Sequence, residues 1–585
     1  MSINRSYLNI LSIGLLLLNS SDFAYAQKKL LLIGGATNLC SSLQPTNCDS
    51  KIDWQKLAQD QGYPSNVQIK YQEMLQLTDL SIQNLKAKKD YPSWAISDLQ
   101  RLDKSKKYSV DDFKTQIAKI DSHFIDDLSD DNWEATLNFL SITQSEIVSY
   151  KNSPVYTQNL FDKFVDLSGG SNAVIGIVSA SSQDYMDTYI FYKNAFKLAG
   201  PKEVVWIPID LALRKARQNN DCDNIQNYVA SEYGEYDTKR RYPDLTNYQI
   251  QKCKDSRSLM DDLNRITGIF FCGGDQAKHK ESFITSSGSD TDEMKIIRQR
   301  VNSGQVTLSG SSAGTAVMGG PSKKQDVPMI AGGQSFQSLV DKPLDYICTT
   351  SDCQDDLQYD PQGGLDIFQT GLLDTHFSQR GRQGRAIRLA SLRNLDFAFG
   401  CDETTAILLI DQQNQTTINV IGEYGISLFD LRSSKKGSSS QFSIQNVYWS
   451  YLTQGDQIVF SQDGSIKISA ASFKSRVRES GRSLTTTDVF SSPDRQSGRD
   501  NYMEFVVIGT SLIDSTDTTT WGETYETDPS IYRVNFKKVS STQGFKGVDP
   551  NGDQRYSIIN MSLDVQPKSR DEDQTENVAR SFLSL

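Results

Sequence analysis

The run Val174-Ile175-Gly176-Ile177-Val178 decides the fold class, because a short apolar strand is followed at once by a different periodicity. Residues 185–198 have the apolar spacing of a helix, and 204–209 and 266–271 are again short apolar runs. Strands that alternate with helices at this spacing form a parallel sheet covered on both faces. Residues 30–36 add a further buried strand that ends in a glycine turn. We therefore predict an α/β protein.

Two polar stretches interrupt this pattern. Residues from about 40 to 160 are rich in Lys, Gln and Asp and have apolar residues at helical spacing, which indicates an inserted helical region on the surface. Residues from about 215 to 258 are polar and rich in Tyr and Asn, which indicates a second surface insertion. With these insertions, the α/β domain is predicted to cover residues 27–430.

The C-terminal part of the chain has a different texture. Beyond about residue 430, helical periods give way to short β-patterned runs separated by Gly, Ser, Thr and Asp, for example 457–460, 503–508 and 532–536. We predict a β-rich region over residues 431–585, either as a domain of its own or as an extension of the sheet.

The composition excludes several classes of protein. With 37% hydrophobic and 23% charged residues among 585, the chain is neither wholly disordered nor a fibrous rod. A net charge of -11 would repel polyphosphate, so nucleic acid is not an expected partner. With only three histidines, a Cys/His zinc cluster is not expected either, and no metal or cofactor is predicted.

The first 26 residues have the pattern of a signal peptide. Arg5 marks a short basic region, residues 8–18 are apolar, and Ala24-Tyr25-Ala26 is a small-x-small cleavage site. A retained membrane anchor is the alternative, but the apolar run is shorter than the roughly 20 residues that a spanning helix needs. We expect cleavage after Ala26 and a secreted or periplasmic protein without a membrane span.

The eight cysteines are compatible with export to an oxidising compartment. Three pairs lie close enough in sequence to form disulfides within loops, namely Cys40/Cys48, Cys222/Cys253 and Cys348/Cys353. Cys272 and Cys401 lie in apolar runs, where they are either buried thiols or a fourth bridge.

The strongest chemical motif is Gly310-Ser311-Ser312-Ala313-Gly314, which follows the apolar strand 306–309. A G-x-S-x-G sequence allows a tight strand-to-helix turn that exposes a strained serine where the helix begins. The sequence predicts this nucleophile elbow with a helix from Ala316, and Ser312 is the candidate nucleophile. The alternative is a Ser/Gly-rich turn that only caps a helix.

A serine nucleophile needs a base, and the chain offers His123, His279 and His376. His123 lies in the helical insertion, and His279 lies between two lysines. His376 follows an apolar run, at the kind of strand end where an α/β sheet exposes catalytic groups. It is therefore the preferred base.

An acidic pair supplies the third candidate group. Asp402-Glu403 lies between two apolar runs, so one carboxylate could hold the imidazole in one tautomer, unless the pair is simply a solvated hairpin turn. The order Ser, His, Glu differs from the order Ser, Asp/Glu, His of an α/β-hydrolase, which argues against a lipase or esterase.

Four motifs together resemble a known family. Residues 270–276 (FFCGGDQ), 310–314 (GSSAG), 374–382 (DTHFSQRGR) and 402–406 (DETTA) resemble cyanophycinase, in the serine peptidase family that also contains aspartyl dipeptidase. The resemblance covers about residues 29–37 and 160–430. It implies a flavodoxin-like or class I glutamine-amidotransferase-like three-layer sandwich, to which this chain adds the helical insertion and the β-rich C-terminal extension.

The resemblance also implies an activity and the residues that perform it. Cyanophycinases cut cyanophycin (multi-L-arginyl-poly-L-aspartate) exolytically to β-Asp-Arg dipeptides through an acyl-enzyme. Ser312 matches the nucleophile, His376 the base and Glu403 the acid, with Asp402 and Asp374 left open as alternative acids. The amides near Gly274 and Ala313 match the oxyanion hole. The candidate substrate contacts are Asp275, Gln276, Asp374, Arg380 and Arg382.

Three functions remain open at this stage. The first is cyanophycin hydrolysis, with the polymer or aspartyl-arginine peptides as partners. The second is an exopeptidase for aspartyl dipeptides or other isopeptides. The third is a non-catalytic exported protein that binds its ligand on the same fold. The oligomeric state is also open, with a homodimer as one option.

Overall fold

The computed structural model describes residues 27–320, 325–348, 350–412, 415–438, 441–492 and 503–568. The predicted signal peptide therefore lies outside the described residues. Within the described part of the chain, no helix is both long enough and apolar enough to cross a membrane.

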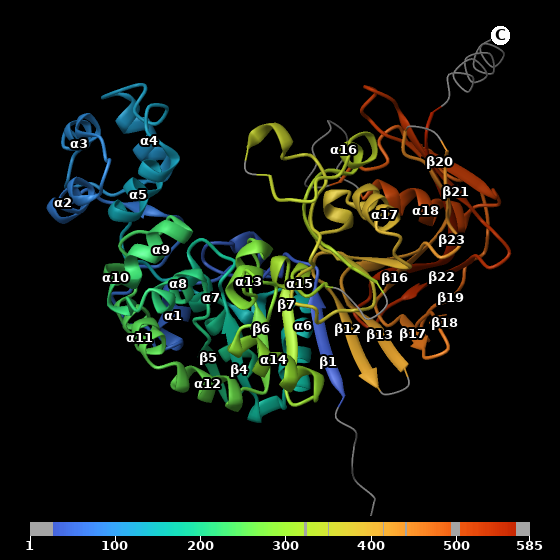
Figure 1. Ribbon diagram of the computed structural model, residues 1–585, viewed down its shortest axis with the longest axis horizontal. Helices are drawn as coiled ribbons and strands as arrows, with labels where there is room; N and C mark the ends of the chain where they lie inside the picture. Colours follow the sequence, from blue (N-terminus) through green and yellow to red (C-terminus); the bar gives the residue numbers. More distant parts are fainter. Residues whose placement is uncertain are drawn as a thin grey trace, which may run out of the picture.

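The core is a nine-stranded sheet with the order β18-β17-β13-β12-β1-β7-β6-β4-β5 (Figure 1). Its strands are β1 (Lys28–Ile33), β4 (Val174–Val178), β5 (Glu203–Trp206), β6 (Gly268–Phe271), β7 (Thr307–Ser311), β12 (Thr405–Gln412), β13 (Gln415–Gly422), β17 (Gln457–Ser461) and β18 (Ile466–Ser469). The half from β1 to β5 is parallel, and the half from β12 to β18 is antiparallel. The predicted parallel sheet is thus confirmed, and antiparallel strands continue it.

Helices cover both faces of this sheet. Alternate residues of β1 point to opposite faces, so that Leu31 and Ile33 pack against α6 (Val155–Leu167) and α7 (Tyr185–Ala199). Leu30 and Leu32 belong to the apolar cluster of the other face, with α12 (Ser256–Arg265) and α14 (Asp292–Asn302). This arrangement confirms the expected α/β sandwich, of the flavodoxin-like type.

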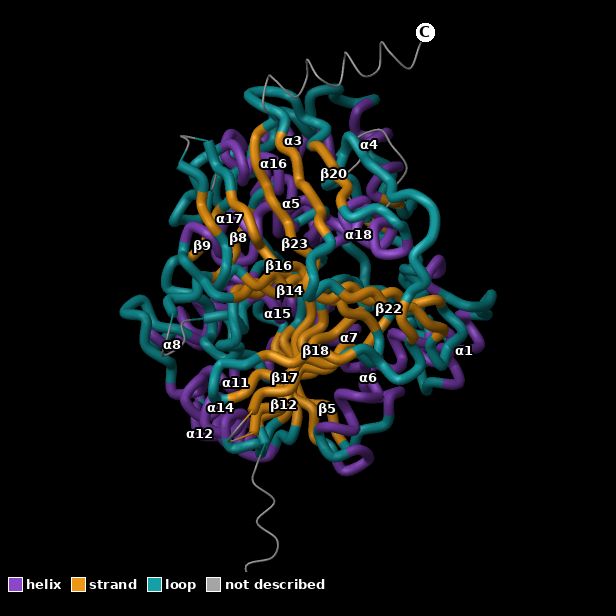
Figure 2. The backbone as a smooth tube through the Cα atoms, turned by 90° about the vertical axis from the view of Figure 1, so that its right-hand side faces the viewer, coloured by secondary structure: helices purple, strands orange, loops and turns teal. Residues whose placement is uncertain are grey.

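A second sheet of ten strands packs beside the first, and its long strands lie above the strands of the core sheet in Figure 2. Its main path is β10-β11-β14-β16-β23-β21-β20, and β15, β19 and β22 pair at its side. Its strands are β10 (Leu372–Asp374), β11 (Phe397–Cys401), β14 (Gly425–Asp430), β15 (Lys435–Lys436), β16 (Ile444–Thr453), β19 (Ser475–Arg476), β20 (Thr519–Glu523), β21 (Tyr532–Lys537), β22 (Gln543–Val548) and β23 (Gln554–Pro567). Both sheets combine strands from before and after residue 430. The β-rich C-terminal extension is therefore confirmed, and it extends sheets that begin earlier in the chain.

One predicted strand of this region is wrong. Residues 503–508 have a β-branched pattern, but from Glu504 onward they form α18 (Glu504–Asp514). Phe505, Ile508 and Leu512 are buried on one face of this helix, and the Phe505 ring centroid lies 5.0 Å from that of Trp449. Packing on the second sheet, at helical spacing, overrides the local β propensity.

The helical insertion after β1 forms a lobe with its own apolar cluster, to the upper left in Figure 1. Its helices are α2 (Asp79–Ala87), α3 (Ser93–Leu99), α4 (Val110–Ala118) and α5 (Asp130–Leu140), with a short hairpin of β2 (Met74–Leu75) and β3 (Tyr108–Ser109). The first helix of the insertion, α1 (Trp54–Asp60), lies outside this lobe and packs in a small apolar cluster of its own. The second polar stretch is also mainly helical. Its helices are α8 (Leu211–Gln218), α9 (Ile225–Tyr233), α10 (Thr238–Arg241) and α11 (Pro243–Lys254).

Further elements follow along the chain between β6 and β11. They are α13 (Gln276–Phe283), α15 (Ala313–Ala316), β8 (Met329–Gly332), α16 (Ser335–Val340), β9 (Gln358–Asp360) and α17 (Gln383–Leu392).

The cysteines pair as the sequence predicts. Disulfides join Cys40 to Cys48, Cys222 to Cys253 and Cys348 to Cys353. Cys272 and Cys401 are buried free thiols, so the alternative of a fourth bridge is wrong. Both lie at the ends of strands in the core, where burial raises the pKa of each thiol well above its usual value.

Candidate active site

Ser312 lies at the turn between β7 and α15 and has a φ of 54°, in the left-handed region that side chains rarely adopt. The turn is tight because its two glycines have no Cβ, so that neighbouring backbone segments can approach them closely. A Cβ on Gly310 would lie 2.2 Å from the carbonyl oxygen of Gly314, and a Cβ on Gly314 would lie 2.1 Å from that of Phe271. The helix begins at Ala313, not at the predicted Ala316, because the N–H of Ala316 already bonds to the carbonyl of Ser312 at 2.8 Å.

His376 follows β10, and the backbone of the glycine turn after β1 supports it. The N–H of His376 donates to the carbonyl of Gly34 at 2.8 Å, and the residue has a φ of 48°. A Cβ on Gly35 would lie 2.3 to 2.7 Å from three atoms of the imidazole ring, so the ring lies directly against the backbone of Gly35. Only glycine leaves this space for the ring.

The structure brings Ser312, His376 and Glu403 into one hydrogen-bonded chain. Nε2 of His376 lies 2.6 Å from Oγ of Ser312, and Nδ1 lies 2.5 Å from Oε1 of Glu403. Glu403 lies where the chain passes from β11 in the second sheet to β12 in the core sheet, so the acidic pair is not a hairpin turn. A serine, an imidazole and a carboxylate in this order can activate a hydroxyl for attack on an acyl carbon.

The environment favours a neutral imidazole. Burial lowers the pKa of His376, and the nearby charges of Arg380 and Arg382 lower it further, whereas the hydrogen bond and charge of Glu403 oppose these effects. The net pKa is below that of a free histidine, so the ring is unprotonated at neutral pH. A neutral ring that contacts a hydroxyl can accept its proton.

The other two candidate acids are engaged elsewhere. The carboxylate of Asp402 accepts the N–H of Ser378 and the hydroxyl of Tyr451, each at 2.8 Å. Asp374 is 2% exposed and pairs with Arg385 through two hydrogen bonds of 2.6 and 2.8 Å. Glu403 is therefore the carboxylate that contacts the imidazole.

The residues matched to the oxyanion hole adjoin the serine. Ala313 follows it directly. The loop of Gly273 and Gly274 lies beside it, since a Cβ on Gly273 would lie 3.3 Å from Cβ of Ser312. The hydroxyls of Ser181 and Ser182 hold this loop by donating to the carbonyl of Gly273 at 2.8 and 2.9 Å.

The residues matched to substrate contacts make contacts within the protein. The amide of Gln276 donates to the carbonyls of Ile330 and Ala331 in β8, at 2.9 and 3.1 Å. Asp275 caps α13 by accepting the N–H of Ala277 at 2.8 Å. Arg382 donates to the carbonyl of Thr375 at 2.7 Å. The charge of Arg380 is close enough to His376 to lower the pKa of the imidazole.

Two contributors were not identified from the sequence. Arg385 forms the buried ion pair with Asp374. Its position among apolar residues of α17 is the sequence feature that could have predicted a buried, paired arginine. Gln379 accepts the N–H of Glu403 at 3.0 Å, for which the sequence carries no signal.

The other two histidines make different contacts. His123 is exposed on the insertion. His279 is buried against Phe271 and bonds to the carbonyl of Cys272 at 2.9 Å, and burial lowers its pKa to about 4.

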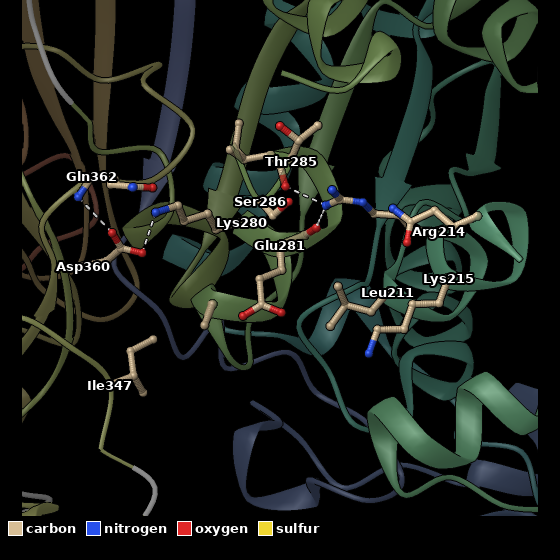
Figure 3. A pocket seen from close by; sticks show the side chains of 13 residues that line it. Leu211, Arg214, Lys215, Lys280, Glu281, Thr285, Ser286, Ile347, Asp360 and Gln362 are labelled. Carbon is tan, nitrogen blue, oxygen red and sulfur yellow. Dashed lines mark hydrogen bonds and ion pairs between the residues drawn. The ribbon is translucent and has the colours of Figure 1, made fainter. Parts of the chain in front are cut away.

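A cavity of about 400 Å³ lies apart from these groups, between α8, α13 and the segment that carries Ile347 and Asp360 (Figure 3). An ion pair of 2.5 Å between Lys280 and Asp360 lies in its wall. None of the three hydrogen-bonded residues lines this cavity. The candidate site is therefore defined by the side-chain geometry and not by this cavity.

No protein-family model matches the chain. It is similar to a cyanophycinase from Geminocystis herdmanii, with 26% identity over 313 residues, which cover 52% of this chain and 88% of that protein. A cyanophycinase from Trichormus variabilis is 29% identical over 217 residues, 35% of this chain and 61% of that protein. One from Thermosynechococcus vestitus is 24% identical over 309 residues, 51% of this chain and 73% of that protein. These matches confirm the resemblance that the four motifs predict: over a third to a half of its length, the chain is cyanophycinase-like.

Proposed function

We propose that this protein is a serine-type hydrolase that degrades cyanophycin exolytically to β-Asp-Arg dipeptides. The observation that carries the proposal is the chain of hydrogen bonds from Ser312 through His376 to Glu403, at 2.6 and 2.5 Å. The similarity to several cyanophycinases supports the substrate, and hydrolysis of a peptide bond is the chemistry for which this set of side chains is suited.

In the proposed mechanism, the neutral imidazole of His376 takes the proton of Ser312 as the hydroxyl attacks the scissile carbonyl. Glu403 fixes the tautomer and stabilises the imidazolium that forms. Amides of the Gly274 loop and of Ala313 donate to the oxyanion. His376 then protonates the leaving amine, and water hydrolyses the acyl-enzyme by the same route. No step requires a metal.

Substrate recognition is proposed to use the arginines that follow the base. The polymer carries carboxylates and guanidinium groups, so a binding surface must offer both signs of charge. Arg380 and Arg382 are the proposed contacts for a substrate carboxylate, and Gln276 is a proposed polar contact for a substrate guanidinium. The buried pair of Asp374 and Arg385 holds the same segment in place, which suits an orienting role for Asp374.

We also propose that the enzyme is exported and acts on polymer outside the cytoplasm. The predicted signal peptide motivates this proposal, and the three disulfides support it because disulfides persist in oxidising compartments.

The test uses the chain without residues 1–26, incubated with insoluble cyanophycin and, separately, with β- and α-linked aspartyl dipeptides. We expect the turbidity of cyanophycin to fall and β-Asp-Arg to appear. Ser312→Ala should abolish both, whereas Ser303→Ala, at the half-buried residue that caps the C-terminus of α14, should not. Circular dichroism of each variant controls for the fold.

Each alternative predicts a different result. Clearing of the polymer that persists in Ser312→Ala would exclude the serine mechanism. Cleavage of dipeptides without clearing would select the aspartyl exopeptidase. Binding of polymer without any cleavage would select the non-catalytic binding protein.

A further inference from the structure

The C-terminal extension contacts the two loops that carry the base and the acid. The described parts of the extension beyond residue 430 reach these loops at three points. Tyr451 of β16 bonds to Asp402, and Met503 bonds to Gln379. A Cβ on Gly381 would lie 2.2 Å from the carbonyl oxygen of Phe490, so this backbone also abuts the loop after His376.

The contact of Tyr451 with Asp402 is buried and joins two polar groups. Tyr451 is 4% exposed and Asp402 is fully buried, and the phenol donates to Oδ2 of the carboxylate at 2.8 Å. The ring crosses β14 at Gly425, where a Cβ would lie 2.5 Å from the ring carbon that bears the hydroxyl. The backbone of β14 therefore leaves room for the phenol to reach Asp402.

Asp402 joins the two loops. Its Oδ1 accepts the N–H of Ser378, two residues after His376, at 2.8 Å. Its own backbone leads directly into Glu403, whose carboxylate bonds to the imidazole. One carboxylate, itself held by Tyr451, thus fixes the separation between the segment of the base and the segment of the acid.

Gln379 makes a second link between the same segments. Its Oε1 accepts the N–H of Glu403 at 3.0 Å, and its Nε2 donates to the sulfur of Met503 at 3.4 Å. Both links run from the extension to the same pair of catalytic candidates. The relation between His376 and Glu403 is therefore supported from the second sheet and not only from the core sheet.

We propose that Tyr451 and Asp402 are positioning residues, and that the C-terminal extension holds His376 and Glu403 in the geometry that activates Ser312. This inference rests on the proposed serine mechanism. It assigns a role to the extension, whose strands build the second sheet beside the loops.

Tyr451→Phe tests the proposal because it removes one hydroxyl and keeps the ring. Tyr556→Phe is the matched control: its phenol also donates to a carboxylate, Asp514, at 2.8 Å, and it lies in β23 of the same sheet. Two rates are measured for each protein. One is the rate at which a fluorophosphonate labels Ser312, displacing fluoride, with the labelled residue identified by mass spectrometry. The other is kcat and apparent KM for cyanophycin.

In Tyr451→Phe we expect labelling and kcat to fall by about 10- to 100-fold, as for a small misplacement of reacting groups, with apparent KM within about twofold of the wild type. Tyr556→Phe should keep both rates. Melting temperatures measured alongside show that the variants are folded. Wild-type rates in a folded Tyr451→Phe protein would overturn the proposal, and so would equal losses in the two variants.

A double-mutant cycle with Asp402→Asn supplies the second readout. If Tyr451 acts through Asp402, the double variant should lose about as much activity as Asp402→Asn alone. Losses that multiply would mean that the two residues act independently, and would overturn the proposed linkage.

The two assays separate this inference from the substrate assignment. If wild-type Ser312 is labelled but cyanophycin is not degraded, the substrate is wrong and the labelling rates still decide the role of Tyr451. If Ser312 is not labelled in the folded wild type, the serine mechanism fails and the proposal fails with it.

Discussion

Gly35→Ala should inactivate the enzyme without changing any residue that reacts. The new Cβ would lie 2.3 Å from Cε1 and 2.4 Å from Nε2 of His376. Carbon atoms in contact lie about 3.5 Å apart, so the ring would have to withdraw by about 1.2 Å. That shift is nearly half of the 2.6 Å hydrogen bond between Nε2 and Oγ of Ser312, and it breaks the proton-transfer geometry.

A misplacement of 1 Å can reduce a rate by about 100-fold. This loss corresponds to roughly 2.7 kcal/mol of transition-state stabilisation. We therefore expect kcat on cyanophycin, and the rate of fluorophosphonate labelling of Ser312, to fall at least about 100-fold in Gly35→Ala. Apparent KM should change much less, because the ring moves and the residues proposed to contact substrate do not.

Backbone strain must be separated from the clash. Gly35 has a φ of 133°, so alanine there is strained even without a neighbour. Gly169→Ala is the matched control, since Gly169 has a φ of 118° and a Cβ there would meet atoms only at 3.8 Å or beyond. The melting temperature should decrease by a similar amount in both variants, but only Gly35→Ala should lose activity. If a folded Gly35→Ala protein keeps half of the wild-type kcat, the proposal that the imidazole must lie against the backbone of Gly35 is refuted.

Three further predictions concern pH and stability. Glu403→Gln removes a group that raises the pKa of His376. The fall of kcat/KM on the acid side of its pH profile should therefore occur at lower pH in this variant, and kcat should decrease. A shift of that fall to higher pH would contradict the contact between Glu403 and His376. Burial raises the pKa of Asp210 to about 7, whereas the pKa of an aspartate in an unfolded chain is about 3.9. The folded protein therefore holds this proton more tightly, and the contribution of Asp210 to stability is lost as the pH rises from about 4 to about 7. In Asp210→Asn the melting temperature should therefore fall less between pH 4 and pH 8 than in the wild type, and an equal fall would count against the shift. Removing the disulfide of Cys222 and Cys253, which are 31 residues apart, should lower the free energy of unfolding by about 3 to 4 kcal/mol in denaturant titrations, and a loss below about 1 kcal/mol would show that the unfolded chain is already constrained.

The features that the sequence predicts correctly are mostly local. The strand at 174–178, the turn at Ser312 and the three disulfides each depend on residues close together in the chain. Short apolar runs, glycine spacing and cysteine separation carry that information directly. Residues 503–508 show the limit of this reasoning, because they pack against residues distant in sequence, such as Trp449 and Phe536.

The choice among the three candidate acids is not local. Asp402 and Glu403 are neighbours in the chain, and both follow an apolar run. Their different contacts arise because the chain crosses there from one sheet to the other, so that Asp402 meets Tyr451 and Glu403 meets His376. The partner of each carboxylate is fixed by strands that pair with distant segments, which no periodicity reveals.

Glycines at several elements make this site by letting groups approach a backbone. Gly35 leaves space for the imidazole, Gly425 for the phenol of Tyr451, and Gly400 for the ring of Phe377, which a Cβ would meet at 2.2 Å. Gly400 and Gly425 lie in strands of the second sheet, and Gly35 lies in the turn that follows β1 of the core sheet. Because a shift of about 1 Å affects a rate far more than it affects packing, substitutions at these positions should reduce activity before they unfold the protein. The relation between the two sheets is therefore part of the geometry of the candidate site, and the core sheet alone does not define it.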